Sequence, residues 1–151
     1  MKVIIASDHA GYAYKTILEK ALKEEDYEVL DLGAHSIVTT DDYPDYAILA
    51  AEALLNGDAD RAILICGSAV GVSIAANKFK GIRAAVCHDT YSAHQSVEHD
   101  NANILCMGQR VIGIALAQDI VHSFLKARFS NGPRHNRRLA KIDALENKNM
   151  I

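Results

Sequence analysis

The 151-residue chain lacks the features of disulfide-stabilised, membrane-spanning and disordered proteins. Its three cysteines are few and odd in number, so we expect no disulfide framework and a reducing, cytoplasmic setting. Its longest apolar stretches have the length of a strand, well short of the roughly 18 residues of a membrane span, and no signal-peptide pattern is visible. Half of the residues are hydrophobic, which is enough for one core in a single domain over 1–151.

The common nucleotide, redox and metal motifs are also missing. The loop 67–71 has the spacing G-x-x-x-G, which is neither a Walker loop nor the G-x-G-x-x-G of dinucleotide-binding folds. Val72 stands where a thiol phosphatase would carry arginine, and Ala69 where a redox C-x-x-C motif would carry its second cysteine. No pair of histidines has zinc spacing with a third ligand nearby, so no metal site is predicted.

Positive charge is scarce in the first part of the chain and concentrated near its end. Residues 1–60 contain eight Asp and five Glu but no Arg, whereas residues 126–148 contain seven basic and two acidic residues. The net charge of −3 disfavours a nucleic-acid binder. The basic segment suggests an anionic small ligand or an acidic face of a second subunit, and a solvated helix surface is an equally good explanation.

Apolar runs of strand length alternate with segments of helical periodicity. Strands are expected at 2–7, 28–32, 61–66, 82–87 and 103–107, and helices at 12–25, from Pro44 to Gly57, at 70–79, 90–98 and 113–128, and after Pro133. Five strands separated by helices predict a three-layer, doubly wound α/β domain of the flavodoxin or Rossmann kind, with a parallel sheet. The most apolar strand, 61–66, should be central.

Ligands of such folds bind at the carboxyl ends of the strands, so the residues that follow each strand are the candidates for function. Reactive side chains occur in Ser7–Gly11, Cys66–Gly71, Cys87–Asp89, Glu98–Asn101 before the fifth strand, and Met107–Arg110. We expect their carboxylate, imidazole, thiol, hydroxyl and guanidinium groups to gather on one rim of the sheet.

Cys66 begins the turn after the most buried strand. Amide groups and the dipole at a helix start favour a thiolate there, and Gly67 and Gly71 let backbone amides face a ligand closely. Ser68 adds a hydroxyl beside the thiol. A small apolar residue that closes a buried strand is the alternative interpretation of Cys66, and it is our interpretation of the other two cysteines.

Acid–base and anion-binding groups complete the set of candidates. Asp8 and His9 can move protons on and off oxygen near neutral pH, although an Asp helix cap with an exposed His fits as well. His99 lies in a polar setting, either as a functional or as a surface histidine. Arg134 and Arg138 share a helix face that suits a phosphate group, which Arg110 could also contact.

These residues lie within a recognisable family pattern. The chain resembles the type B ribose-5-phosphate isomerases, a branch of the ribose/galactose-6-phosphate isomerase family, over nearly its whole length. The matching segments are SDHAGY (7–12), DYPDYA (42–47), ILICGSAVGVSIAANKFKGIRAAVC (63–87), HDNANIL (99–105), GQRVIG (108–113) and PRHNRR (133–138).

The resemblance implies interconversion of ribose 5-phosphate and ribulose 5-phosphate through an enediolate, without metal or cofactor, in the pentose phosphate pathway. By resemblance, Cys66 is the base that moves the proton between C1 and C2, and Ser68 helps to stabilise the enediolate. The amides of Gly67–Gly71 form the oxyanion and sugar cradle. His99, with Asp8 nearby, opens the sugar ring.

The resemblance also implies how the substrate is held. His9, Arg110, Arg134 and Arg138 correspond to phosphate-contacting positions, and Tyr43 lines the pocket. The family forms homodimers or homotetramers with active sites shared between subunits. Because the last helix is basic, we infer that it delivers its arginines to the pocket of a partner subunit.

The chain departs from the family pattern at three positions. Ala69 replaces the usual glycine, which costs roughly 1 kcal/mol or more if the backbone φ is positive there. Asp100 occupies a substrate-binding position where asparagine is expected, and its carboxylate repels a sugar phosphate. Ser68 lacks the methyl group of the usual threonine. An isomerase of allose or galactose 6-phosphate and a non-catalytic sugar-phosphate-binding module are therefore alternatives.

Overall fold

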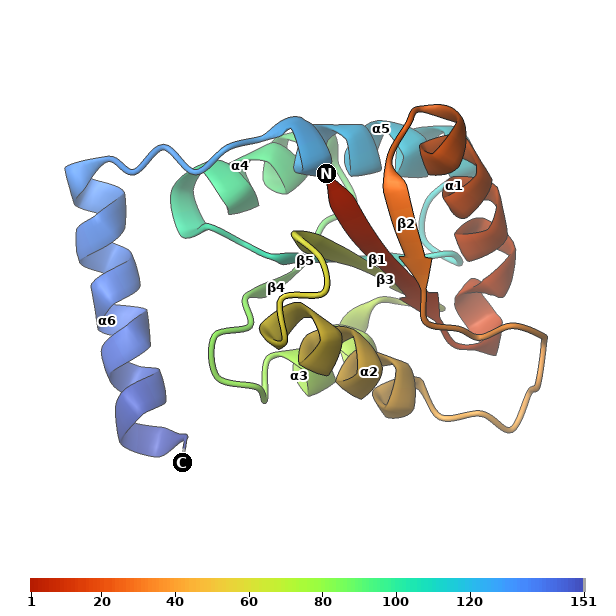
Figure 1. The fold of residues 1–151 in the computed structure, drawn as a ribbon, viewed down its shortest axis with the longest axis horizontal. Helices are drawn as coiled ribbons and strands as arrows, with labels where there is room; N and C mark the ends of the chain where they lie inside the picture. Colours follow the sequence, from red (N-terminus) through yellow and green to blue (C-terminus); the bar gives the residue numbers. More distant parts are fainter. Residues whose placement is uncertain (151) are drawn as a thin grey trace.

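The computed structural model describes residues 1–150 and contains a five-stranded parallel sheet between two layers of helices (Figure 1). The strands are β1 (Lys2–Ser7), β2 (Glu28–Asp31), β3 (Arg61–Cys66), β4 (Ala84–Val86) and β5 (Ile104–Gly108). Their order is β2-β1-β3-β5-β4, so β3 is central. The predicted α/β class, the parallel sheet and the central position of β3 are confirmed.

Alternating side chains of the buried strands separate the core into two clusters. The short turn η1 (His9–Gly11) leads into α1 (Tyr12–Glu24), which covers one face together with α4 (Thr90–Asp100) and α5 (Ile114–Lys126). The other face is covered by α2 (Tyr43–Leu55) and α3 (Val70–Ala76). In β1, Val3 and Ile5 belong to the first cluster, whereas Ile4 and Ala6 belong to the second.

Two neighbouring elements, α3 and β4, are each three residues shorter than predicted. The helix expected to reach Phe79 ends at Ala76, and the strand expected at 82–87 is reduced to β4. The cause is a turn between them, in which the Ile82 N–H donates to the Phe79 carbonyl at 3.1 Å. Asn77 then holds the start of β4 through two hydrogen bonds between its side chain and the backbone of Ala84.

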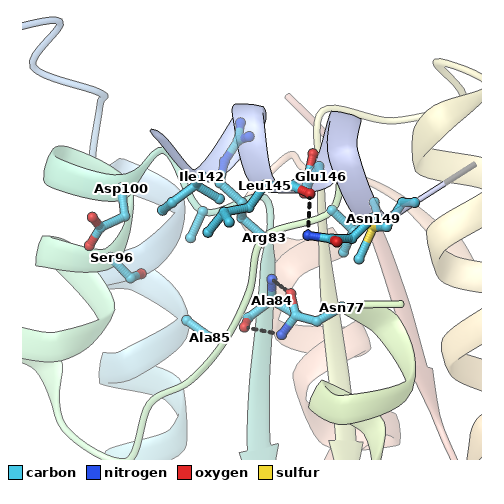
Figure 2. A pocket seen from close by; sticks show the side chains of 13 residues that line it. Asn77, Arg83, Ala84, Ala85, Ser96, Asp100, Ile142, Leu145, Glu146 and Asn149 are labelled. Carbon is cyan, nitrogen blue, oxygen red and sulfur yellow. Dashed lines mark hydrogen bonds between the residues drawn. The ribbon is translucent and has the colours of Figure 1, made fainter. Parts of the chain in front are cut away.

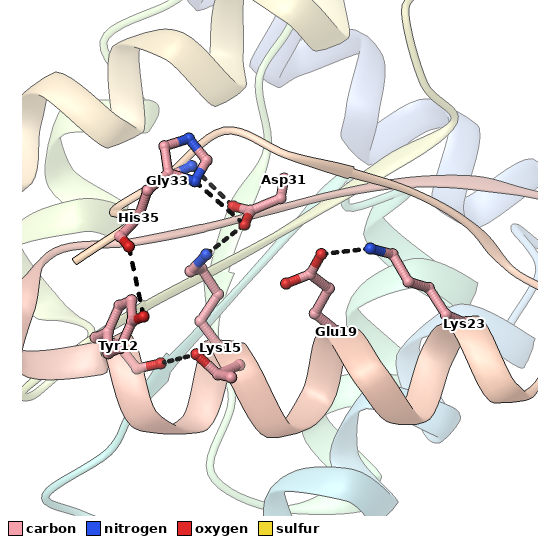
Figure 3. Close-up of polar contacts among 8 residues, drawn as sticks. Tyr12, Lys15, Glu19, Lys23, Asp31, Gly33 and His35 are labelled. Carbon is pink, nitrogen blue, oxygen red and sulfur yellow. Dashed lines mark hydrogen bonds and ion pairs between the residues drawn. The ribbon is translucent and has the colours of Figure 1, made fainter.

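A buried lysine fixes α1 against the end of β2 (Figure 3). Lys15 is 2% exposed, and its Nζ lies 2.6 Å from Oδ2 of Asp31. The other oxygen of Asp31 accepts a hydrogen bond from the Gly33 N–H at 2.8 Å. The Ala34 N–H donates to the Ser7 carbonyl at 2.6 Å, so the loop that leaves β2 starts beside the end of β1.

The last helix, α6 (Pro133–Asn149), stands at the edge of the molecule beside β4 (Figure 1). Between them lies a groove of about 470 Å³, whose walls include β4 and the apolar face of α6 (Figure 2). Ile142 is 40% exposed and Leu145 is 61% exposed, so this face is only partly covered. Among the described residues, no helix has the length and apolar character needed to cross a membrane.

Candidate active site

The loops after β1, β3 and β5 and the start of α2 surround a pocket of about 320 Å³, here called the strand-end pocket. It is lined by Asp8, His9, Ala10, Tyr43, Cys66, Gly67, Ser68, Gly71, Arg110 and Val111. The structure therefore brings together eight of the twelve residues that the sequence predicts for the site. The four that it places elsewhere are His99, Asp100, Arg134 and Arg138.

Cys66 ends β3 at the floor of this pocket and is 5% exposed. The Ala69 N–H donates a hydrogen bond to its Sγ at 3.0 Å, a contact that stabilises negative charge on sulfur. The loop can make this contact because Ala69 adopts a left-handed conformation, with φ of 73°. Ala69 thus carries the backbone strain that is predicted above for an alanine with a positive φ.

Two glycines let large side chains approach the loop that follows Cys66. A Cβ at Gly71 would lie 2.6 Å from the ring of Tyr43, so only glycine leaves room for that ring. A Cβ at Gly67 would lie 3.2 Å from Nη1 of Arg110, whose backbone N–H donates to the Gly67 carbonyl at 3.0 Å. A phenol and a guanidinium group are thereby held beside Cys66.

Asp8 is both a cap and an acid–base candidate. Its Oδ1 accepts hydrogen bonds from the N–H groups of Ala10 at 3.0 Å and Gly11 at 3.2 Å, so the capping interpretation is correct. Burial raises the pKa of the Asp8 carboxyl, although these hydrogen bonds oppose the shift. A carboxyl group with a raised pKa is better suited to exchange protons with a sugar oxygen near neutral pH.

Asp41 is a residue of this site that the sequence interpretation missed. Its carboxylate lies 2.5 Å from Nδ1 of His9 and accepts the backbone N–H of His9 at 3.0 Å and the Tyr46 hydroxyl at 3.1 Å. Burial acts in the opposite direction, but these hydrogen bonds hold the pKa of Asp41 below its usual value. The only signal in the sequence is a pair of acidic residues before the helix at Pro44.

Asp8, His9 and Asp41 also offer donor atoms of a metal-binding type within 4.8 Å of one another. His9 Nδ1 and both Asp41 oxygens already take part in hydrogen bonds within the protein. The arrangement thus functions as a hydrogen-bonded cluster, and the absence of a metal requirement stays a prediction.

A second group of predicted residues gathers where α4 ends and α6 begins, here called the α4–α6 cluster: His99, Arg134, Arg138 and, in addition, His135. The rings of His99 and His135 are stacked, with their centroids 4.1 Å apart. Arg134 Nε donates to Nε2 of His135 at 3.1 Å, so Nδ1 of His135 carries the proton that it shares with Ser130 Oγ at 2.5 Å. The sequence pattern predicts no role for His135.

The expectation that all of these groups lie on one rim is wrong within a single chain. Cys66 pairs with Gly108 at the carboxyl end of the sheet, whereas Ala62 pairs with Ile104 at its amino end. His99 lies before Ile104, so about 13 Å of strand separates its level from that of Cys66. The physical reason is that α4 runs back along the sheet, and its last turn returns to the amino ends of the strands.

The same correction applies to Asp100, but not to Arg134 and Arg138, which are predicted to reach the pocket of a partner subunit. Asp100 lines the groove beneath α6 rather than the strand-end pocket (Figure 2). Arg134 and Arg138 lie on exposed positions of α6. Asp8 and His99 are therefore not neighbours in one chain.

Comparisons with known proteins agree on one family. A family model described as ribose/galactose isomerase matches residues 3–142. The ribose-5-phosphate isomerase B of Escherichia coli is 45% identical over 147 residues, 97% of each chain. The D-erythrulose-4-phosphate isomerase 2 of Mycolicibacterium smegmatis is 47% identical over 131 residues, 85% of this chain and 86% of its own. The structure of ribose-5-phosphate isomerase B from Clostridium thermocellum superposes with a TM-score of 0.95 at 51% identity, covering 98% and 99% of the two chains.

Proposed function

The chain belongs to the ribose/galactose isomerase family and is a sugar-phosphate isomerase, and we propose that it interconverts ribose 5-phosphate and ribulose 5-phosphate. The observation that carries the proposal is Cys66 on the floor of the strand-end pocket, with a backbone N–H directed at its sulfur. This is a base in a water-poor site, as abstraction of a proton from carbon requires.

The reaction proposed for the open-chain sugar needs one base and several hydrogen-bonding groups that bind the sugar oxygens. The Cys66 thiolate takes the proton from C2 of ribose 5-phosphate. The electron pair of that C–H bond forms the C1–C2 double bond while the π pair of the C1 carbonyl moves to O1, which gives an enediolate. Return of the proton to C1, with transfer of a hydroxyl proton from O2 to O1, gives ribulose 5-phosphate. Ser68 and the amides of Gly67–Gly71 hold the two oxygens during this exchange.

Ring opening precedes that step and needs an acid–base pair. We assign Asp8 and His99 to it, with His99 supplied by a partner subunit. Support comes from the raised pKa of Asp8 and from the position of His99 at the opposite end of its own sheet. An imidazole from a second copy is the simplest way to pair the two groups.

The phosphate group would be held by guanidinium and imidazole groups of both subunits. Arg110 and His9 face the strand-end pocket, while Arg134 and Arg138 extend from α6 of the other chain. The exposed apolar face of α6, beside the edge strand β4, offers the surface on which a second copy would pack. We thus propose a homodimer, or a homotetramer built from it, with two shared sites per pair of chains.

A second substrate deserves a test because of the similarity to a D-erythrulose-4-phosphate isomerase. Allose and galactose 6-phosphate are the six-carbon alternatives. The non-catalytic binding module is not retained, because the relatives that align over most of the chain are isomerases.

The deciding experiment is a comparison of kcat/KM for ribose 5-phosphate with those for D-erythrulose 4-phosphate, allose 6-phosphate and galactose 6-phosphate. The assay is run with and without a metal chelator. We expect ribose 5-phosphate to be preferred by at least about tenfold, a difference of about 1.4 kcal/mol in transition-state binding, and the chelator to have no effect. Preference for another sugar phosphate would reassign the substrate, and loss of activity with the chelator would overturn the metal-free mechanism.

A further inference from the structure

Asp41 forms hydrogen bonds with both the side chain and the backbone of His9. The imidazole Nδ1 lies 2.5 Å from Oδ1 of Asp41, and the backbone N–H donates to Oδ2 at 3.0 Å. The Tyr46 hydroxyl donates to the same Oδ2 at 3.1 Å, which holds the carboxylate from the side of α2. The Asp41 side chain is only 11% exposed, so water competes weakly for these contacts.

This arrangement determines which nitrogen of His9 is available to a ligand. With Nδ1 committed to a carboxylate, Nδ1 carries a proton in both the neutral and the charged ring. Within residues 1–150, Nε2 makes no hydrogen bond; it belongs to a side chain that lines the strand-end pocket and is 27% exposed. When the ring is protonated on both nitrogens, Nδ1 stays bonded to Asp41 while Nε2 can donate to an anion.

We propose that Asp41 is a positioning residue that makes His9 a donor to the phosphate group of the substrate. The inference rests on the proposed function, because it takes the ligand of His9 to be a sugar phosphate. Asp41 itself does not line the pocket, so it acts through His9 rather than on the substrate.

The test compares Asp41→Ala and Asp41→Asn with Asp45→Asn. Asp45 is an exposed carboxylate in the first turn of α2 and makes no side-chain hydrogen bond among the described residues, so it controls for the loss of one negative charge. The readouts are kcat and KM for ribose 5-phosphate and the inhibition constant of inorganic phosphate. Nitrogen chemical shifts of His9 report its tautomer.

We expect Asp41→Ala to raise KM and the inhibition constant of phosphate about tenfold while kcat changes less than about twofold, as for loss of a charge-assisted hydrogen bond. Asp41→Asn keeps an oxygen acceptor for Nδ1 and should have a smaller effect in the same direction. Asp45→Asn should match the parent protein. In the parent, the His9 shifts should show a protonated Nδ1 without ligand and protons on both ring nitrogens with phosphate bound, whereas Asp41→Ala should give a mixture of tautomers without ligand.

A double-mutant cycle with His9→Gln separates positioning from a general effect on the fold. If Asp41 acts through His9, Asp41→Ala should add little to the rise in KM that His9→Gln already causes. Full additivity of the two changes, or a fall in kcat at unchanged KM, would overturn the proposal. If Asp41→Ala folds poorly, Tyr46→Phe is a milder variant, because it removes only one hydroxyl. It should raise the inhibition constant of phosphate slightly.

The outcomes also distinguish this inference from the proposed function. If His9→Gln leaves KM unchanged, the phosphate role of His9 fails. If His9→Gln raises KM but Asp41→Ala does not, only the positioning role of Asp41 fails.

Discussion

The strand-end pocket and the α4–α6 cluster are built in different ways, although both hold residues expected in one active site. The pocket is made by loops whose backbone is fixed by the sheet, and its reactive groups Asp8 and Cys66 are each held by N–H donors of the backbone. The cluster is made by side chains on two helices and is held by the stacking of His99 on His135. One region is anchored in the core, and the other stands at the edge of the molecule.

The chemistry of the two regions is complementary. The pocket combines a thiol and one carboxylate, that of Asp8, with a single guanidinium, that of Arg110, whereas the cluster supplies imidazoles and two further guanidinium groups. An isomerase of a sugar phosphate needs both sets, because it must bind a dianion and also abstract a proton. Neither region alone holds all the residues proposed for the site, and this is the structural argument for the proposal that sites are shared between two chains.

The largest effect is expected from the pocket. Cys66→Ala should lower kcat by more than about a thousandfold because it removes the base, while ribose 5-phosphate binding stays within about tenfold. Rapid-quench kinetics and equilibrium binding measure the two quantities. Retention of more than about a tenth of kcat would remove Cys66 from that role.

Alkylation provides an independent check on Cys66. Burial raises the pKa of the Cys87 thiol to about 11, and burial also raises the pKa of the Cys106 thiol. Cys66 should therefore react first with iodoacetamide near neutral pH, and ribose 5-phosphate should protect it. Equal labelling of the three thiols would contradict this expectation.

The next effect tests whether the cluster serves a partner chain. Arg134→Ala should raise KM about ten- to hundredfold, as expected for loss of a charge-assisted hydrogen bond of about 1.5–3 kcal/mol. At a ribose 5-phosphate concentration well below the raised KM, mixing this variant with Cys66→Ala under conditions of subunit exchange should restore activity, because one site of each heterodimer combines an intact pocket with an intact α6. If exchange is demonstrated and activity is not restored, each chain supplies its own arginines.

A smaller effect, which depends on direction, is expected for the imidazole of the cluster. His99→Asn should lower kcat about tenfold from ribose 5-phosphate, whose ring must open, and less from ribulose 5-phosphate. Initial rates with each substrate measure the difference; KM must change in parallel, because the equilibrium fixes the ratio of kcat/KM values. An equal loss of kcat in both directions would indicate a structural role for His99.

The smallest effect concerns the strained loop of the pocket. Ala69→Gly should stabilise the protein by up to about 1 kcal/mol, because relief of left-handed strain of about 1–2 kcal/mol exceeds the added entropy of the unfolded chain. Ala76→Gly is the matched control, because Ala76 is also buried but lies in the right-handed helix α3, and it should destabilise by about 1 kcal/mol. Urea unfolding measures both, and destabilisation by Ala69→Gly would mean that packing of the methyl group dominates.

The sequence predicts the pocket well because its residues follow strands directly. The apolar run 61–66 identifies β3, and the position of Cys66 at its carboxyl end then follows from the chain direction in a parallel sheet. Asp41 could not be found in this way, because the loop before α2 has no periodicity and its contact with His9 spans 32 residues. Only the folded chain brings the two together.

The prediction that His99 lies on the same rim of the sheet as Cys66 is wrong for a different reason. The place of His99 before a strand indicates the amino end of the sheet, but its polar neighbours and its family role suggested the rim that holds Cys66. Both observations can be correct only if the role is carried out in another copy. No role can be predicted for His135 from the sequence, because its contacts with His99 and Arg134 depend on how α6 packs against α4.

The location of α6 at the edge of the molecule has a consequence for how activity depends on the amount of protein. In the proposed shared site the acidic and basic halves lie on different chains, so a lone chain would hold no working site, and turnover per chain would fall once the protein is diluted below the dissociation constant of the pair. Substrate that bridges the two halves would hold them together, so saturating sugar phosphate would protect a dilute sample from inactivation.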